Sequence, residues 1–260
     1  MVKLARCLPS VIAITLLVAI GSVGRISAST SSDPSPSPAT TYHPAIDPND
    51  FTTTINNPYF PLIPGTTYIY EGPEDGDKTR DEVKVTTSTK EVLGVTCVDV
   101  LDRVYTNGEL SENTHDWYAQ DKAGNVWYFG EASSTIEEGT PTSSEGSWKA
   151  GVDGALPGII MPANPHVGDT YRQEYYAGVA EDMAEVTAIS GTIDVPYGHF
   201  KQILVTREWS PLEPKVEEEK TYAKGVGDVR ERTTKGGNEK LELVEVRKSS
   251  AASPVATPTS

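Results

Sequence analysis

Pro64-Gly-Thr-Thr-Tyr68-Ile-Tyr-Glu-Gly72 is echoed later in the chain by Val167-Gly-Asp-Thr-Tyr171-Arg-Gln-Glu174, and this echo decides the fold. Each stretch opens on a Gly turn and continues as a short run rich in Thr and Tyr, which is typical of a β-strand.

A second pair of stretches follows the first at nearly the same distance. Tyr118-Ala-Gln-Asp-Lys-Ala-Gly-Asn-Val126 is answered by Tyr222-Ala-Lys-Gly-Val-Gly-Asp-Val229. Tyr68 and Tyr118 are 50 residues apart, and Tyr171 and Tyr222 are 51 apart. A match in both order and spacing predicts an internal repeat, with one copy at residues 64–131 and the other at 167–234.

Each copy is expected to be an antiparallel meander. The first carries strand signals at Thr66–Glu71, Glu82–Ser88, Val92–Val104, Thr114–Gln120 and Val126–Glu131, with polar or Gly turns between them. A meander that cannot cover its own apolar face must bury it against a neighbour. We therefore predict an all-β fold in which two related antiparallel meanders form one curved sheet or an incomplete β-barrel.

The second copy contains the one stretch that argues against an all-β fold. Val179, Met183 and Val186 have helical spacing within Val179–Ile189, but the repeat aligns this stretch with the strand around Val83–Val85, so a strand is preferred. The remaining strands are expected at Thr192–Val195, His199–Glu208, Val216–Ala223, Gly227–Thr233 and Glu239–Val246.

The two copies are joined by residues 132–166, which we expect to be an irregular connector. Its central part, Gly146–Pro165, is apolar but contains many Gly and Pro residues, which disfavour a long helix or a central strand. Trp148, Leu156 and Ile159 gain free energy by leaving water, so the connector should pack on the body.

The ends of the chain have other compositions. Residues 1–28 combine two early basic residues, an apolar run and a small residue at a cut site, the layout of a secretory signal peptide; an uncleaved N-terminal anchor is the alternative. Residues 29–41 form a Ser/Pro-rich linker, and residues 249–260 form a similar tail that we expect to be disordered. Residues 42–248 form the single folded β domain.

Charge and cysteine content limit the partners. Cleavage after Ala28 removes three of the 22 basic residues and none of the 37 acidic ones, which leaves a formal charge of −18 (19 − 37). Such an acidic protein repels nucleic acid and anionic lipid, and no other segment is apolar enough to insert into a membrane. The protein should be secreted or extracytoplasmic, in the cell envelope. Cys97 is the one remaining cysteine and is interpreted as a buried structural thiol.

Candidate metal sites are few, whereas carboxylates are so plentiful that a pair of them proves little. The four histidines lie in separate contexts, and His115-Asp116 is the best single candidate for a metal site, with a capping role for the hairpin as its alternative. Glu174 and Asp182 lie just after the connector among small or apolar residues, where burial would raise the pKa of a carboxyl group. A solvated sheet edge is the plainer interpretation of these two acids.

The strongest remaining signal is aromatic. Trp117 and Trp127 lie on the two arms of one hairpin, so strand alternation sends about half of its aromatic residues to each face. One face should join the core, and the other is either covered by Trp148 or offers a stacking surface for a glycan or another flat ligand. The candidate ligand-binding residues are therefore Trp117, Trp127, Trp148, Glu174 and Asp182.

Several stretches resemble an uncharacterised family of secreted bacterial all-β proteins. They are Asn57–Gly72, Asp116–Glu131 and Gly146–Val186, and the resemblance extends over most of the body. The resemblance implies the fold and brings no reaction, cofactor or ligand. The Tyr-Ala-Lys-Gly-Val-Gly hairpin is more loosely similar to curved β-sheet carrier proteins of the bacterial envelope.

Three functions remain open, and the first is preferred. It is a noncatalytic binding module that holds a small apolar or flat ligand between the sheet and the connector. The second is a metal-dependent or carboxylate-based hydrolase that uses His115, Asp116, Glu174 and Asp182, although the sequence shows no nucleophile elbow, phosphate loop or dinucleotide motif. The third is a structural envelope protein without a ligand. No cofactor can be assigned.

Overall fold

The computed structural model describes residues 42–249 and contains strands β1 to β18. Within this range a single turn of 3-10 helix, Pro48–Asp50, is the one helical element, so the predicted all-β fold is confirmed. No helix in the described part of the chain is long and apolar enough to cross a membrane. The predicted signal peptide (1–28), linker (29–41) and residues 250–260 of the predicted tail lie outside the described residues.

The first half of the chain forms five long strands that pair in sequence order. They are β2 (Thr66–Glu74), β3 (Asp77–Val92), β4 (Val95–Thr106), β5 (Glu109–Asp121) and β6 (Val126–Glu137). Three short strands attach to this meander: β1 (Phe51–Thr52) pairs with β5, while β7 (Thr140–Ser143) and β8 (Trp148–Lys149) pair with β6. Every pairing is antiparallel.

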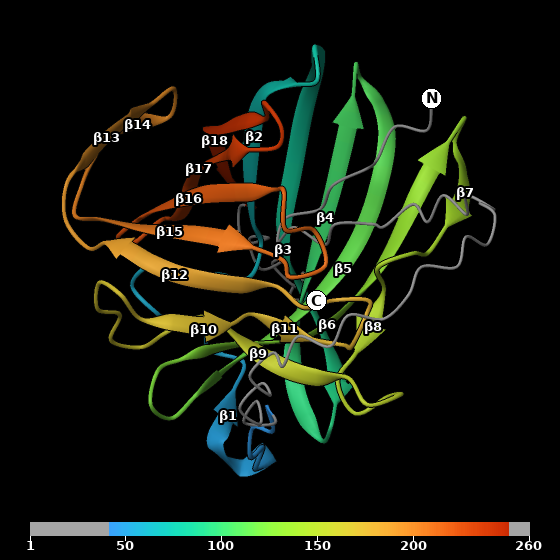
Figure 1. Ribbon diagram of the computed structural model, residues 1–260, viewed down its shortest axis with the longest axis vertical. Helices are drawn as coiled ribbons and strands as arrows, with labels where there is room; N and C mark the ends of the chain where they lie inside the picture. Colours follow the sequence, from blue (N-terminus) through green and yellow to red (C-terminus); the bar gives the residue numbers. More distant parts are fainter. Residues whose placement is uncertain (1–41, 250–260) are drawn as a thin grey trace, which may run out of the picture.

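The second half forms a matching series of shorter strands. They are β10 (Thr170–Arg172), β12 (Met183–Ala188), β15 (Ile203–Trp209), β16 (Glu217–Ala223) and β17 (Gly227–Lys235), followed by β18 (Lys240–Lys248), which pairs with β2. A separate hairpin, β13 (Thr192–Val195) and β14 (Gly198–Lys201), projects from the body (Figure 1).

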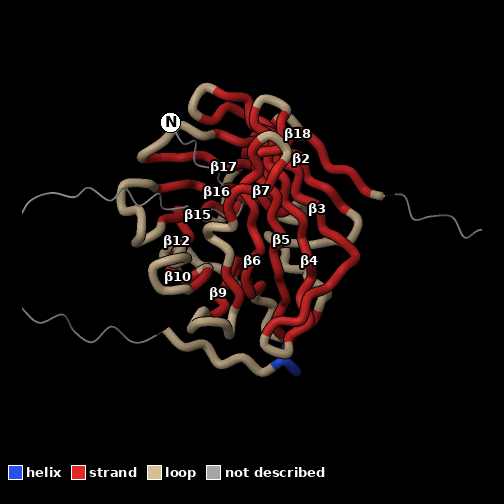
Figure 2. Tube along the Cα trace, turned by 90° about the vertical axis from the view of Figure 1, so that its right-hand side faces the viewer, coloured by secondary structure: helices blue, strands red, loops and turns tan. Residues whose placement is uncertain are grey.

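One run of chain brings the two edges of the sheet together. β9 (Leu156–Met161) pairs with β6 on one side and with β11 (Glu174–Tyr175) on the other, while β10 pairs with β12. Only Gln173 separates β10 from β11, so the sheet is nearly closed into a barrel. Figures 1 and 2 show the long strands β3, β4 and β5 and the shorter β12, β15 and β16 as two flanks of this curved wall.

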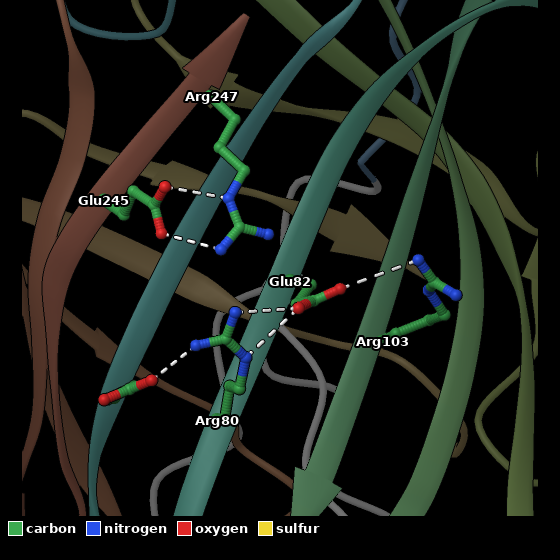
Figure 3. Close-up of polar contacts among 6 residues, drawn as sticks. Arg80, Glu82, Arg103, Glu245 and Arg247 are labelled. Atoms are coloured by element: carbon green, nitrogen blue, oxygen red, sulfur yellow. Dashed lines mark hydrogen bonds and ion pairs between the residues drawn. The ribbon is translucent and has the colours of Figure 1, made fainter. Parts of the chain in front are cut away.

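The two faces of the sheet differ in how their charges are compensated. On the outer face, acidic and basic side chains form ion pairs across β3, β4 and β18 (Figure 3). Arg80 contacts Glu71 and Glu82, and Arg247 donates to Glu245 at 2.7 and 2.8 Å. Such exposed pairs each contribute about 0 to 1 kcal/mol. The inner face holds the apolar core together with many buried carboxyl groups.

The predicted irregular connector, residues 132–166, is wrong in part. β6 extends into it, and it contains β7, β8 and β9. Pro157 lies near the start of β9, where its neighbour is the two-residue strand β11, and the pairing of β9 with β6 covers only Gly158 to Met161. Trp148 is buried, as expected for a connector packed on the body.

Two predicted strands are each broken by a turn. Val92–Val104 is interrupted because Leu93 and Gly94 both adopt positive φ, at 51° and 77°, and turn β3 into β4. His199–Glu208 is interrupted at Gln202, with φ of 60°, between β14 and β15. Cys97 is a free, fully buried thiol, as predicted, and burial raises its pKa to about 12.

Candidate functional site

A cavity of about 80 Å³ lies inside the barrel, between the barrel wall and residues 60–62. Its lining is mostly apolar and aromatic and comes from both halves of the chain: Phe60, Pro61, Leu62, Tyr68, Tyr70, Val83, Val100, Asp116, Tyr118, Ile160, Lys220, Tyr222, Val226, Gly227 and Asp228. An apolar cavity with a few convergent polar groups is the usual form of a small-molecule site.

The segment Ile55–Pro64, which we call the arm, closes the cavity on one side. Leu62 N–H donates to the carbonyl of Ile55 at 3.1 Å, so the arm forms a loop with its ends held together. The buried Asn57 fixes the base of this loop, because its Nδ2 donates to the carbonyls of Gly124 and Pro162 at 3.0 Å each. Phe60, Pro61 and Leu62 of the arm line the cavity.

Phe60 at the tip of the arm contacts both halves of the chain. Its ring centroid is 5.4 Å from that of Tyr118 on β5 and 6.5 Å from that of Tyr222 on β16. Gly225 N–H donates to the carbonyl of Pro58 at 2.6 Å and fastens the arm to the turn between β16 and β17. Phe60 is only partly buried, so its side chain forms part of the cover and part of the cavity wall.

Asp116 supplies a polar group at the cavity wall. It is 1% exposed, and its Oδ1 accepts from the hydroxyl of Tyr128 at 2.7 Å. The same hydroxyl lies 2.6 Å from Oε2 of Glu131, so one phenol bridges two carboxyl groups. Burial, and then the neighbouring Glu131, raises the pKa of Asp116 well above its usual value. The Oδ2 atom of Asp116 has no hydrogen-bond partner within residues 42–249.

Glu174 and Asp182 extend this acidic group. Burial raises the pKa of Glu174 well above its usual value, and the adjacent Asp182 raises it further, while the Trp148 indole partly offsets the rise. Burial raises the pKa of Asp182 to about 8. Trp148 itself packs edge-to-face on Tyr128, with centroids 5.3 Å apart. Burial therefore favours the protonated form of both acids.

Lys220 provides the basic group of the cavity, opposite in charge to the acids around it. Its Nζ lies 3.4 Å from Oε2 of Glu208 and 3.4 Å from Oε2 of Glu231. Burial alone would lower the pKa of Lys220, but the surrounding carboxylates raise it well above its usual value. Burial raises the pKa of Asp228 to about 7, although the Lys220 ammonium acts in the opposite direction.

The predicted metal pair, His115 and Asp116, is wrong as a shared site. Successive residues of a strand point to opposite faces, so Asp116 faces the interior and His115 faces outward, with 43% of its side chain exposed. His115 Nδ1 instead lies 3.0 Å from Oδ1 of Asp99, which also accepts from the Trp117 indole at 3.2 Å. The four-residue hydrolase site that included His115 is not assembled.

Three of the five predicted ligand-binding residues come together and two do not. Trp148, Glu174 and Asp182 are neighbours in the interior. Trp117 lies on the outer side with Asp99 and beneath the Lys90 ammonium, 5.3 Å from the ring. Trp127 packs on Phe51 of β1, and its indole donates to Asp121 at 2.8 Å. Neither residue lines the cavity.

The sequence did not reveal most of the cavity, including Phe60, Lys220 and Asp228, nor the buried Glu131 beside Asp116. A signal for the buried acids was present, because Val98, Val100, Asp102 and Val104 alternate along β4 and place a carboxyl group on the apolar face. The position of Phe60 had no such signal, since an irregular loop has no period.

No protein-family model matches this chain, and no curated protein matches it. Two solved structures have a similar fold. One is described as an exported protein with a YmcC-like fold from Bacteroides fragilis; it has a TM-score of 0.43 and 18% identity, and the alignment covers 73% of this chain and 99% of that one. The other is described as a lipoprotein from Parabacteroides distasonis, with a TM-score of 0.39 and 12% identity over 72% of this chain and 97% of that one.

Proposed function

We propose that this protein is a noncatalytic binding module that holds a small, largely apolar ligand inside the barrel, beneath the arm. The observation that carries the proposal is the cavity wall itself, which is aromatic and aliphatic except where Asp116, Lys220 and Asp228 face it. This supports a ligand position under Phe60 and Pro61 of the arm. The connector contributes only Ile160 to the lining. The proposed site therefore lies beneath the arm and not between the sheet and the connector, as the sequence suggested.

The unpartnered Oδ2 of Asp116 indicates the chemistry of one end of the ligand. A buried oxygen without a partner costs about 1 to 3 kcal/mol, and a ligand that donates a hydrogen bond to it recovers this free energy. The aromatic rings of Tyr118 and Tyr222 offer flat surfaces to the rest of the molecule. A flat apolar ligand with an N–H or O–H group at one end fits both features.

The size of the cavity requires the arm to move. An engineered cavity of about 150 Å³ binds benzene, and this one is about 80 Å³. A ligand larger than a few heavy atoms therefore enters only if Phe60 swings away from Tyr118 and Tyr222. Phe60 is suited to this role because it is partly exposed and belongs to a loop whose anchors lie elsewhere, at Asn57 and Leu62.

The predicted export signal at residues 1–28 supports a binding role outside the cytoplasm. The acidic outer surface, with its paired charges, fits a protein that stays dispersed there. The site would then serve to capture or carry a small molecule in that compartment.

A fluorescence titration with N-phenyl-1-naphthylamine tests the proposal, because this probe is flat, apolar and carries one N–H donor. We expect saturable fluorescence enhancement with the wild-type chain. Val100→Phe fills the cavity from β4 and Val226→Phe fills it from the β16–β17 turn, so each should weaken binding by at least tenfold. Asp116→Asn, which keeps the shape but changes the polar group, should weaken it less.

Val152→Phe is the matched control, since Val152 is 43% exposed and does not line the cavity. Thermal unfolding of each variant checks that the fold survives the added ring. Equal probe affinity in wild type, Val226→Phe and Val152→Phe would show that the probe binds elsewhere and would contradict the proposal.

A further inference from the structure

Three buried glutamates converge on the inner side of the second half of the barrel, apart from the cavity lining. They are Glu218 on β16, Glu231 on β17 and Glu239 just before β18, and one carboxylate oxygen of each lies within 4.8 Å of the others. Their exposed fractions are 3%, 2% and 5%. An ion between three such oxygens would be within coordinating distance after small side-chain adjustments.

The strand register and one tight turn bring these residues together. Glu218 pairs with Thr233, and Thr233 N–H donates to the carbonyl of Glu239 at 3.0 Å, so the chain folds Glu239 back over β17. The turn depends on Gly236, which has φ of 84° and whose added Cβ would lie 2.4 Å from the carbonyl oxygen of Lys215. The convergence is thus fixed by the backbone and not by flexible side chains alone.

Asp81 on β3 is an independent sign that this region holds a further group. It is fully buried, and its side-chain hydrogen bond is made with a second acid, Asp102. Its electrostatic neighbours are all acids: Asp102, Glu231 and Glu239. A buried pair of carboxyl groups costs several kcal/mol unless a shared proton or a cation compensates its charge.

The one basic side chain of the group does not neutralise it. Lys220 contacts Glu208 and Glu231, and it also acts on Glu218. Glu208, Glu231 and Glu218 thus share this single ammonium, while Glu239 and Asp81 lie next to Glu231. Such a concentration of buried acidic side chains suits a bound cation.

We propose that Glu218, Glu231 and Glu239, with Asp81 beside them, bind one calcium ion. Carboxylate oxygens without nitrogen or sulfur ligands select hard cations. Ca²⁺ accepts several monodentate or bidentate carboxylates in flexible geometry, whereas Mg²⁺ demands a near-ideal octahedron and retains several waters. A buried group of four carboxyl groups therefore suits Ca²⁺ better than Mg²⁺. Calcium would then join β3 to β16, β17 and β18.

The test starts from purified wild-type protein, whose calcium content is measured by elemental analysis before and after treatment with EGTA. CaCl₂ is then added in a calorimetric titration, and thermal unfolding is recorded with and without saturating calcium. We expect one calcium per chain and a rise in Tm of roughly 5 °C or more at 100-fold excess over Kd. MgCl₂ in the same titration should bind at least tenfold more weakly.

Glu239→Gln and Asp81→Asn should each weaken calcium binding by at least tenfold. In EGTA both variants should unfold at or above the wild-type Tm, because each removes one member of a group of like charges. Glu109→Gln is the matched control, since Glu109 is exposed on β5, and it should keep the full calcium response.

Two outcomes would overturn the proposal. The first is EGTA-treated wild type that shows neither heat nor a change in Tm on addition of calcium. The second is a calcium response in Glu239→Gln and Asp81→Asn equal to that of Glu109→Gln, which would place the ion elsewhere.

Discussion

Buried carboxyl groups are the residues that set this protein apart from an ordinary β-barrel. Glu112 on β5 is a well-defined example: it is 3% exposed, and its Oε1 accepts from the hydroxyls of Thr114 at 3.0 Å and Ser133 at 3.4 Å. Burial raises its pKa to about 7, although these hydrogen bonds act in the opposite direction. A group of this kind makes stability depend on pH.

Glu112→Gln should remove part of that dependence. The unfolded chain releases the Glu112 proton near pH 4.5, while the folded chain keeps it until about pH 7. Between these values the folded state binds more protons, so the free energy of unfolding falls as pH rises and is constant above both. The contribution of Glu112 is on the order of 3 kcal/mol. Urea unfolding at pH 5 and pH 8 measures it.

Between pH 5 and pH 8, the free energy of unfolding should therefore fall by about 3 kcal/mol less in Glu112→Gln than in wild type. Glu109→Gln, on the same strand but exposed, controls for the change in net charge. An identical loss in wild type and Glu112→Gln would mean that Glu112 is already ionised in the folded protein at pH 5.

At the scale of elements, the seam between β9 and the β10–β11 segment decides whether the barrel closes. The backbones approach so closely there that a Cβ on Gly158 would lie 2.2 Å from the carbonyl carbon and oxygen of Gln173. Gln173 N–H in turn donates to the carbonyl of Asp182 at 2.8 Å. A side chain at position 158 would push the two edges of the sheet apart.

Gly158→Ala should destabilise the protein by about 3 kcal/mol, the upper end of the usual cost of overpacking. Hydrogen exchange should rise first in β9 and β11, whose pairing is lost, and less in β3 and β4. Gly198→Ala is the control, because its Cβ would make an ordinary 3.8 Å contact with Phe200. Equal effects of the two substitutions would show that the seam does not close the barrel.

The elements also show where sequence reasoning succeeds. The long strands of the first half have period-two patterns and Gly turns, and the expected positions of β2, β5 and β6 agree with the structure. β9 was missed because Pro157 and Gly158 argue against a strand on local grounds, and only its distant partners, Glu174 and Tyr175, explain it. Local signals cannot reveal a strand that depends on long-range pairing.

At the scale of the whole molecule, we propose that the two halves are related copies of one meander. β2 to β6 and the series β10, β12, β15, β16 and β17 follow the same order in the sheet. Tyr68 pairs with Val83 and Tyr171 pairs with Ala184, at positions that correspond in the sequence echoes. The corresponding Tyr118 and Tyr222 both contact Phe60, so the arm lies between the two copies.

The candidate site could be predicted from the sequence only in part, because it too depends on contacts between residues far apart in the chain. Trp148, Glu174 and Asp182 were identified because acids and a Trp in small or apolar surroundings indicate burial. Their partners Tyr128 and Glu131, and the cavity above them, arise from closure of the barrel, which brings together residues far apart in the chain. No local sequence pattern predicts that closure.

The proposed function requires a ligand to enter the barrel beneath Phe60. Intermolecular nuclear Overhauser effects between bound N-phenyl-1-naphthylamine and the aromatic rings of the protein test it most directly. We predict contacts with Phe60, Tyr118 and Tyr222, which line the cavity. Contacts confined to outer rings, such as Trp127 or the Tyr197–Phe200 pair on the β13–β14 hairpin, would contradict the claim.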